Sequence, residues 1–99
     1  MRVVLTKTAR LDLISVGDWL AERDRDFANA YVEKLMAAAM KVGEFPGSGV
    51  SRPQWGDAVR VRFVDRYVIA YRIRSDVVEV LRIVHGSRDL DRLFGATND

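Results

Sequence analysis

Arginine is the residue type through which the second half of this 99-residue chain could do chemistry. Residues 52–99 carry nine basic and seven acidic side chains, whereas residues 1–51 carry seven of each. All nine cations are arginines, whose planar guanidinium can bind a carboxylate or a phosphate through two parallel hydrogen bonds. They are Arg52, Arg60, Arg62, Arg66, Arg72, Arg74, Arg82, Arg88 and Arg92. Two interpretations stay open: a solvent-exposed face of internal salt bridges, or a surface for an acidic partner or nucleic acid.

Acid–base chemistry has one obvious candidate, because His85 is the only histidine in the chain. It ends an apolar run, where a lone histidine is more often structural than catalytic. The chain has no cysteine, which excludes disulfides, thiol catalysis and zinc–thiolate sites. With one histidine and no cluster of histidine and acidic residues, we expect no metal site and no cofactor.

Length and composition indicate one small domain spanning residues 1–99. A hydrophobic fraction of 48% is enough for a single core. No apolar run approaches the roughly 18 residues of a membrane helix, and no secretory pattern precedes the first strand. We therefore expect a cytoplasmic protein that does not bind a membrane.

Alternating apolar and polar residues predict three strands in the second half, at residues 59–63, 67–74 and 77–84. Short polar breaks at residues 64–66 and 74–76 separate them, which predicts an antiparallel meander. The third run is apolar on both faces, as in a strand that lies mid-sheet or meets a partner.

Helical spacing of apolar residues predicts a first helix over residues 9–23, after a short β-branched strand at residues 2–5. Thr6 or Thr8 can cap it. Gly17 lies within the helix, where it is unfavourable relative to alanine by up to about 1 kcal/mol. Its position suggests close packing against a neighbouring helix.

The second predicted helix begins at an Asp24 or Asp26 cap and runs to about Val42, which makes an antiparallel helical hairpin with the first. Residues 44–57 follow as an irregular stretch rich in glycine and proline. Its Gly47-Ser48-Gly49 lacks the lysine and hydroxyl residue of a phosphate loop and precedes no helix, so we do not interpret it as one.

These elements follow one another in the order β-α-α-β-β-β. We predict an α+β fold: an N-terminal strand and an antiparallel two-helix hairpin packed on one face of a small antiparallel sheet. Leu90, Leu93 and Phe94 suggest a short helical turn or a docked tail, and residues 95–99 are expected to fray.

Four stretches, in this order and spacing, together resemble the RelE/ParE toxin superfamily over residues 3–92. They are the first-helix pattern Ala9…Asp12-Leu13…Val16…Trp19-Leu20; Phe45-Pro46 with Gly49; the run Arg66-Tyr67-Val68-Ile69-Ala70-Tyr71-Arg72-Ile73; and the run from Val78 to His85 followed by Arg88-Asp89. The resemblance implies a RelE/ParE-like fold. It also implies the toxin of a type II toxin–antitoxin pair, held inactive by a cognate ParD-like antitoxin.

Two activities occur in this superfamily: RelE-like toxins cleave mRNA on the ribosome, and ParE-like toxins poison DNA gyrase. RelE-like members commonly carry an arginine where this chain has Val68, and a tyrosine near the C-terminus where it has Leu93-Phe94. The resemblance therefore favours the ParE-like branch, with gyrase supplying the chemistry, and we assign no catalytic residue. A ribosome-dependent endoribonuclease is the alternative, and a toxin fold without activity is a third possibility.

Two surfaces follow as predictions. We expect the antitoxin to wrap a partly open sheet face containing Val68, Ala70, Val78 and Val80, through helix-in-groove contacts and strand addition at an edge, with arginines meeting its carboxylates. The antitoxin-binding candidates are Arg60, Arg62, Arg72, Arg74, Val68 and Val80. The target-binding candidates lie where the last strand ends: Arg82, His85, Arg88, Leu93 and Phe94. We expect no sequence-specific DNA binding by this chain alone.

Overall fold

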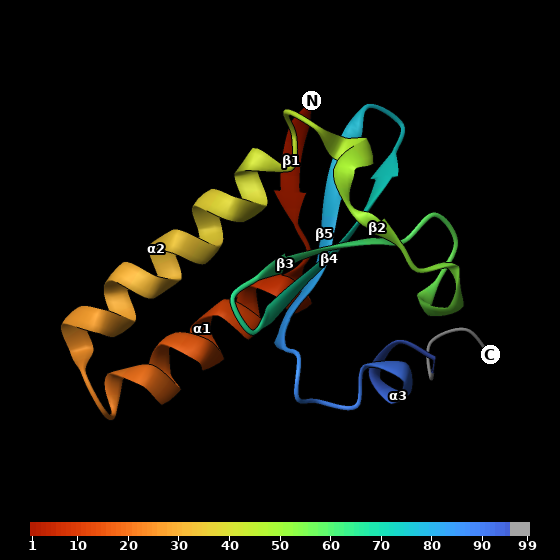
Figure 1. Cartoon of the computed structure of the whole chain (residues 1–99). Coiled ribbons are helices and arrows are strands. Elements are labelled where there is room, and N and C mark those ends of the chain that lie inside the picture. The colour runs from red at the N-terminus through yellow and green to blue at the C-terminus, as the bar shows by residue number, and fades with distance from the viewer. Residues whose placement is uncertain (96–99) are drawn as a thin grey trace.

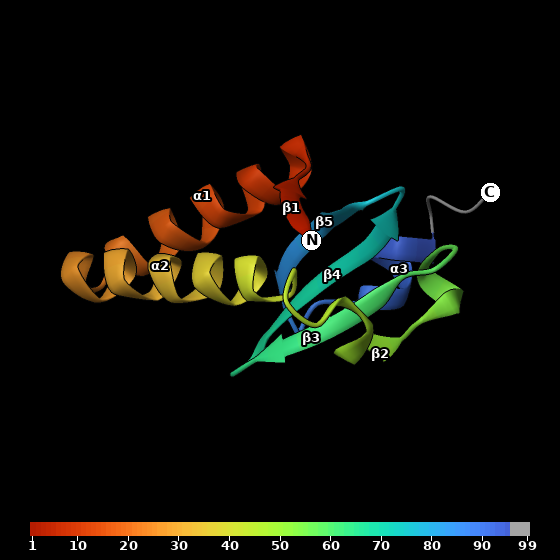
Figure 2. The same cartoon turned by 90° about the horizontal axis from the view of Figure 1, so that it is seen from above.

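The computed structural model describes residues 1–95, which form a two-helix hairpin, a twisted sheet and a short third helix (Figure 1). The elements are β1 (Arg2–Leu5), α1 (Lys7–Ala21), α2 (Arg25–Lys41), the 3-10 turn η1 (Pro46–Ser48), β2 (Val50–Ser51), the 3-10 turn η2 (Pro53–Trp55), β3 (Arg60–Val64), β4 (Tyr67–Arg74), β5 (Val77–His85) and α3 (Leu90–Gly95). Viewed from above, the hairpin lies on one side of the sheet and α3 on the other (Figure 2). The predicted α+β architecture is confirmed.

The sheet has five strands in the order β1-β5-β4-β3-β2. Strands β3, β4 and β5 pair antiparallel, so the predicted meander is confirmed. The N-terminal strand differs from a purely antiparallel sheet: β1 pairs in parallel with β5, and Val3 lies opposite Val78. A parallel pair needs a long connection, which the helical hairpin and the meander provide. The two-residue strand β2 extends the opposite edge beside β3.

Both helices begin at caps that the sequence offers. The Thr6 side chain accepts a hydrogen bond from the Ala9 amide, and the Asp24 side chain accepts one from the Phe27 amide, each at 3.0 Å. A Cβ at Gly17 would lie 3.3 Å from Val32 Cγ2. The prediction that Gly17 marks close packing between the helices is therefore confirmed.

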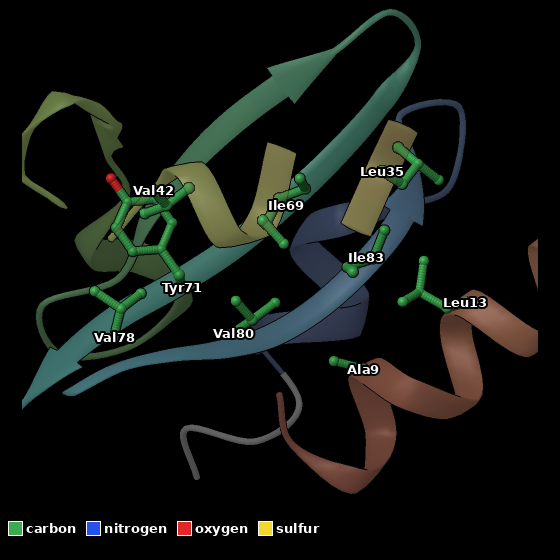
Figure 3. Close-up of a cluster of buried hydrophobic side chains, with 10 residues drawn as sticks. Ala9, Leu13, Leu35, Val42, Ile69, Tyr71, Val78, Val80 and Ile83 are labelled. Atoms are coloured by element: carbon green, nitrogen blue, oxygen red, sulfur yellow. The ribbon is translucent and has the colours of Figure 1, made fainter. Parts of the chain in front are cut away.

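The first core fills the space between the hairpin and the sheet (Figure 3). Leu35 of α2 and Ile69 and Tyr71 of β4 belong to it, and all three are 0% exposed. Ala9 and Leu13 of α1 face Ile83 of β5 across the same layer. This core holds the hairpin over β4 and β5.

A second core lies on the opposite face of the sheet. Trp55 of η2 stacks on Phe94 of α3, with ring centroids 4.9 Å apart, and its indole N–H donates to Asp91 Oδ1 at 2.6 Å. These elements cover Val68 and Ala70. The prediction that this sheet face is partly open is therefore wrong, because a loop and a terminal helix that we did not place there close it.

A β-bulge in β5 changes which side chains share a face. The pairing steps from Ala70 with Arg82 to Tyr71 with Val80, so Leu81 has no partner of its own on β4. As a result Val80 lies in the first core, whereas Leu81 packs on the second. Simple alternation, which groups Val80 with Val84, fails across this point.

The C-terminal end agrees with a docked tail, since α3 packs on η2. Gly95 is the last residue of that helix, and the rest of the predicted frayed segment, residues 96–99, lies outside the described residues. None of the helices in residues 1–95 has the length and apolar character to cross a membrane.

Candidate functional site

The tip of the helical hairpin and the end of β5 enclose two adjoining clefts of about 480 and 370 Å³. Trp19, Tyr67 and His85 line both clefts, so they form one continuous groove. Phe27 and Tyr31 line the smaller cleft. We call this surface the aromatic groove and define it by these five residues.

The aromatic groove is built by spacing within α2 and by strand register. Phe27 and Tyr31 lie four residues apart on α2, and their rings stack at 5.6 Å between centroids. Tyr31 meets Tyr67 at 5.6 Å, and Tyr67 meets His85, its partner across β4 and β5, at 5.2 Å. Trp19, on the last turn of α1, is 54% exposed, and Phe27 is 52% exposed. The groove therefore presents aromatic surface to solvent.

An exposed ion pair fixes one side of the groove. The Tyr31 hydroxyl and the Lys34 ammonium both donate to Asp65 Oδ2 at 2.9 Å. Burial, followed by the hydrogen bond to Asp65, raises the pKa of Tyr31 to about 12. The hydrogen bond from Lys34, followed by that from Tyr31, lowers the pKa of Asp65. The Tyr31 phenol thus stays protonated near neutral pH and is unsuited to act as a base.

His85 is held by the turn that follows it. Its Nδ1 accepts the Ser87 amide at 3.0 Å and lies 2.7 Å from Ser87 Oγ. With Nδ1 accepting from the backbone, the proton of the neutral ring resides on Nε2. The turn therefore orients the imidazole edge-on to Tyr67.

Arg82 forms an ion pair with Asp12 of α1, which lines the larger cleft, whereas Arg82 itself lines a separate cleft with Leu93 and Phe94. Its guanidinium donates to both carboxylate oxygens of Asp12, at 2.8 and 3.1 Å. Asp12 also accepts the Ile83 amide at 2.9 Å, just beyond the bulge. Hydrogen bonding to Asp12 raises the pKa of Arg82 above its ordinary value. Arg82 is thus bound within the fold, and its role as a target contact stays a prediction.

The loop before β2 is fastened to the opposite end of the sheet. The Tyr71 hydroxyl donates to the Pro46 carbonyl at 2.7 Å and accepts the Gly49 amide at 2.9 Å. Arg60 donates to the Gly49 carbonyl at 2.8 Å, and Arg62 donates to Ser48 Oγ at 3.0 Å. Two predicted antitoxin-binding arginines therefore hold this loop in place.

Substituting Gly49 with alanine is expected to destabilise the fold by about 1–3 kcal/mol, because the new methyl group would overlap the Tyr71 phenol. Gly47→Ala is the matched control, since nothing lies within 4 Å of a Cβ at that position. Urea unfolding of both variants measures the difference. Equal stability of the two would contradict this account of the loop.

Arg72 and Arg74 lie at the far end of β4, next to the turn into β5. Arg72 Nε donates to Glu79 Oε1 at 3.0 Å across the strand pair, and Arg74 Nη1 lies 4.0 Å from the other oxygen. The Arg74 side chain is 68% exposed. Ile73, which is 39% exposed, lies between the two arginines in sequence, and strand alternation places it on the opposite face of the sheet.

A family model described as the ParE toxin of the type II toxin–antitoxin system parDE matches residues 3–90. The chain belongs to the ParE toxin family. A solved structure titled "Chromosomal ParDE TA system from P. aeruginosa" is similar in fold, with a TM-score of 0.75 and 19% identity. The match covers 86% of this chain and 95% of that one. None of the curated proteins matches the chain.

In this member of the ParE family, the predicted target-binding residues do not form one cluster. His85 and Arg88 both line the larger cleft of the aromatic groove. Leu93 and Phe94 instead belong to the second core, where Phe94 is 5% exposed. Phe94 is therefore a core residue rather than a surface contact.

The predicted antitoxin-binding residues also separate. Val68 and Val80 are 2% and 0% exposed, one in each core, so neither presents surface to a partner. Arg74, which is exposed, and Arg72, which is half-buried, remain as candidates at the end of β4.

Sequence reasoning missed the groove aromatics Trp19, Phe27, Tyr31 and Tyr67 as one surface. The signal available was the i,i+4 spacing of Phe27 and Tyr31, together with a tryptophan beside the apolar stripe of the first helix.

Proposed function

We propose that this ParE-family toxin poisons DNA gyrase by binding it, and that its own side chains make and break no covalent bond. The main support comes from the residues that this chain has at the positions where RelE-like toxins place RNA-cleaving groups. Val68 stands where the resemblance would require an arginine, and it is buried under η2 and α3. The tail has Leu93-Phe94 in place of a tyrosine, and Phe94 is stacked on Trp55.

The remaining polar groups near the groove support the same proposal. Cleavage of RNA needs a group that activates the 2′-hydroxyl and another that protonates the leaving oxygen. Arg82 is paired with Asp12, and Tyr31 has a pKa of about 12. His85 is held by the turn through Nδ1, which leaves Nε2 available. Of the two groups that cleavage requires, the groove thus offers His85 as one candidate, and we propose no second.

Inducing the chain in cells tests the proposal. Gyrase poisoning predicts filamentation and the DNA-damage response while translation continues. Ribosome-dependent cleavage predicts an immediate stop in translation with truncated mRNA, and that result would reject the proposal. No growth arrest at all would also reject it and favour a toxin fold without activity.

We also propose that a cognate ParD-like antitoxin neutralises the toxin by binding directly, with carboxylates meeting Arg72 and Arg74. These arginines share one carboxylate, Glu79, so their positive charge exceeds its negative charge. An excess of positive charge on this end of β4 fits an acidic segment of the antitoxin.

Reversing the charge at Arg74 is expected to weaken antitoxin binding about tenfold, chiefly by slowing association at low salt. Arg74→Glu is preferred to a change at Arg72, because Arg72 bonds Glu79 more closely within the fold. Arg10→Glu, at an exposed position near the start of α1, is the control. Titration calorimetry with the purified antitoxin measures both, and equal affinities would remove this surface from the proposal.

A further inference from the structure

The aromatic groove carries unbalanced positive charge. Arg66 lines its smaller cleft and Arg88 its larger one, and both are exposed. Within residues 1–95, neither guanidinium forms a hydrogen bond or an ion pair. The two carboxylates that line the groove are already bonded, Asp12 to Arg82 and Asp65 to Lys34.

The ring surfaces beside these cations are held in place before any partner binds. The Arg23 guanidinium lies 3.8 Å from the centre of the Trp19 indole and donates to the Trp19 carbonyl at 3.0 Å. One indole face is thus covered by a cation while the ring stays 54% exposed. Phe27, stacked on Tyr31, is the second accessible ring. Because both rings are already held, a flat ligand that stacks on either ring costs little side-chain conformational entropy.

Exposed aromatic rings next to unpaired arginines are the combination that binds single-stranded nucleic acid, through base stacking and phosphate contacts. A duplex keeps its bases stacked inside and cannot use the rings. A peptide cannot add here as a strand, because Tyr67 and His85 at the groove floor are already paired with each other.

From this combination we propose that the aromatic groove binds a short segment of single-stranded DNA, with bases on Trp19 and Phe27 and phosphates on Arg66 and Arg88. The choice of DNA over RNA rests on the proposed function, since gyrase held with broken DNA presents strand ends. Binding would be independent of sequence, because stacking does not read base edges.

Fluorescence anisotropy of a labelled oligothymidylate of about 12 nucleotides, titrated with the purified chain, tests this directly. We expect saturable binding. A plot of the logarithm of the association constant against the logarithm of the salt concentration should fall with a slope of about 1.4, as for two phosphate contacts. Trp19→Ala should weaken binding about tenfold, as for one lost base stack. Arg66→Ala with Arg88→Ala should remove most of the salt dependence. Arg10→Ala, at the other end of α1, should change neither.

Three outcomes would overturn the inference. One is no saturable binding of the oligonucleotide, or equal binding by Trp19→Ala and the wild type, with circular dichroism confirming that the variant is folded. Another is binding of the matching RNA but not the DNA. The third is that the groove variants weaken antitoxin binding and leave oligonucleotide binding intact, which would assign the groove to an acidic peptide.

Gyrase trapping separates this inference from the proposed function. If the wild type traps gyrase but no oligonucleotide binds, the groove inference fails and the proposed function stands. If oligonucleotide binds as expected but gyrase is unaffected, the proposed function fails and the groove remains a DNA site.

Discussion

Replacing Asp12 with alanine is expected to lower the free energy of unfolding by about 3 kcal/mol. The change removes both hydrogen bonds to Arg82 and the acceptor of the Ile83 amide. The Arg82 side chain is only 22% exposed, so its charge would stay largely desolvated without a partner. The Ile83 amide, which follows the bulge, would lose its acceptor as well.

Urea denaturation followed by circular dichroism measures this loss. Asp18→Ala on the same helix is the control, because Asp18 is exposed, and substitutions at such sites usually stay within about 0.5 kcal/mol. Asp12→Asn should fall between the two, since its amide oxygen can still accept the Ile83 amide without the charge. A loss of under about 1 kcal/mol for Asp12→Ala would mean that the ion pair does not hold α1 to β5.

Truncating Phe94 to alanine is expected to destabilise the fold by about 3–5 kcal/mol. The ring is 5% exposed and stacks on Trp55, so its removal opens the second core over Val68 and Ala70. Phe45→Ala is the control, because Phe45 is 65% exposed. Thermal unfolding of the two variants should therefore differ clearly.

The same substitution decides between two roles for the tail. If Phe94 is a core residue, toxicity should decline only in proportion to the unfolded fraction and should return at lower temperature. If Phe94→Ala unfolds like the wild type yet loses all toxicity, the initial interpretation of Phe94 as a target contact would be right.

Local signals in the sequence predicted the framework. Alternation predicted the β3–β5 meander, and helical spacing with cap residues predicted both helices. The sequence offered two candidate caps for each helix, and the structure uses Thr6 and Asp24. Gly17 predicted the close approach of the helices. Each of these features depends on residues that are close in the chain, where short-range sterics and hydrogen bonding decide the outcome.

Features set by distant contacts were not predictable in the same way. The bulge at Leu81 changes which side chains face the helices. The backbone amide just after the bulge, that of Ile83, binds Asp12, which lies 71 positions earlier in the chain. The second core depends on how η2 and α3 dock, and neither has a periodic pattern long enough to place it.

The candidate site shows the same division. His85 and Arg88 were predicted together because they are neighbours in the chain, and both line the groove. Arg82 and Phe94 were assigned to the target because they lie close to the end of the last strand in sequence, yet here one pairs with Asp12 and the other fills a core. Position in the chain alone does not separate these uses; burial and partners do.

The most direct test is a cleavage assay with purified gyrase, supercoiled plasmid and this chain. If the toxin traps gyrase, we expect linear DNA to accumulate with increasing toxin concentration. Adding the cognate antitoxin first should prevent this accumulation. Contradiction would be gyrase that relaxes and rejoins DNA normally at every toxin concentration, while translating ribosomes yield cleaved mRNA that His85→Ala abolishes.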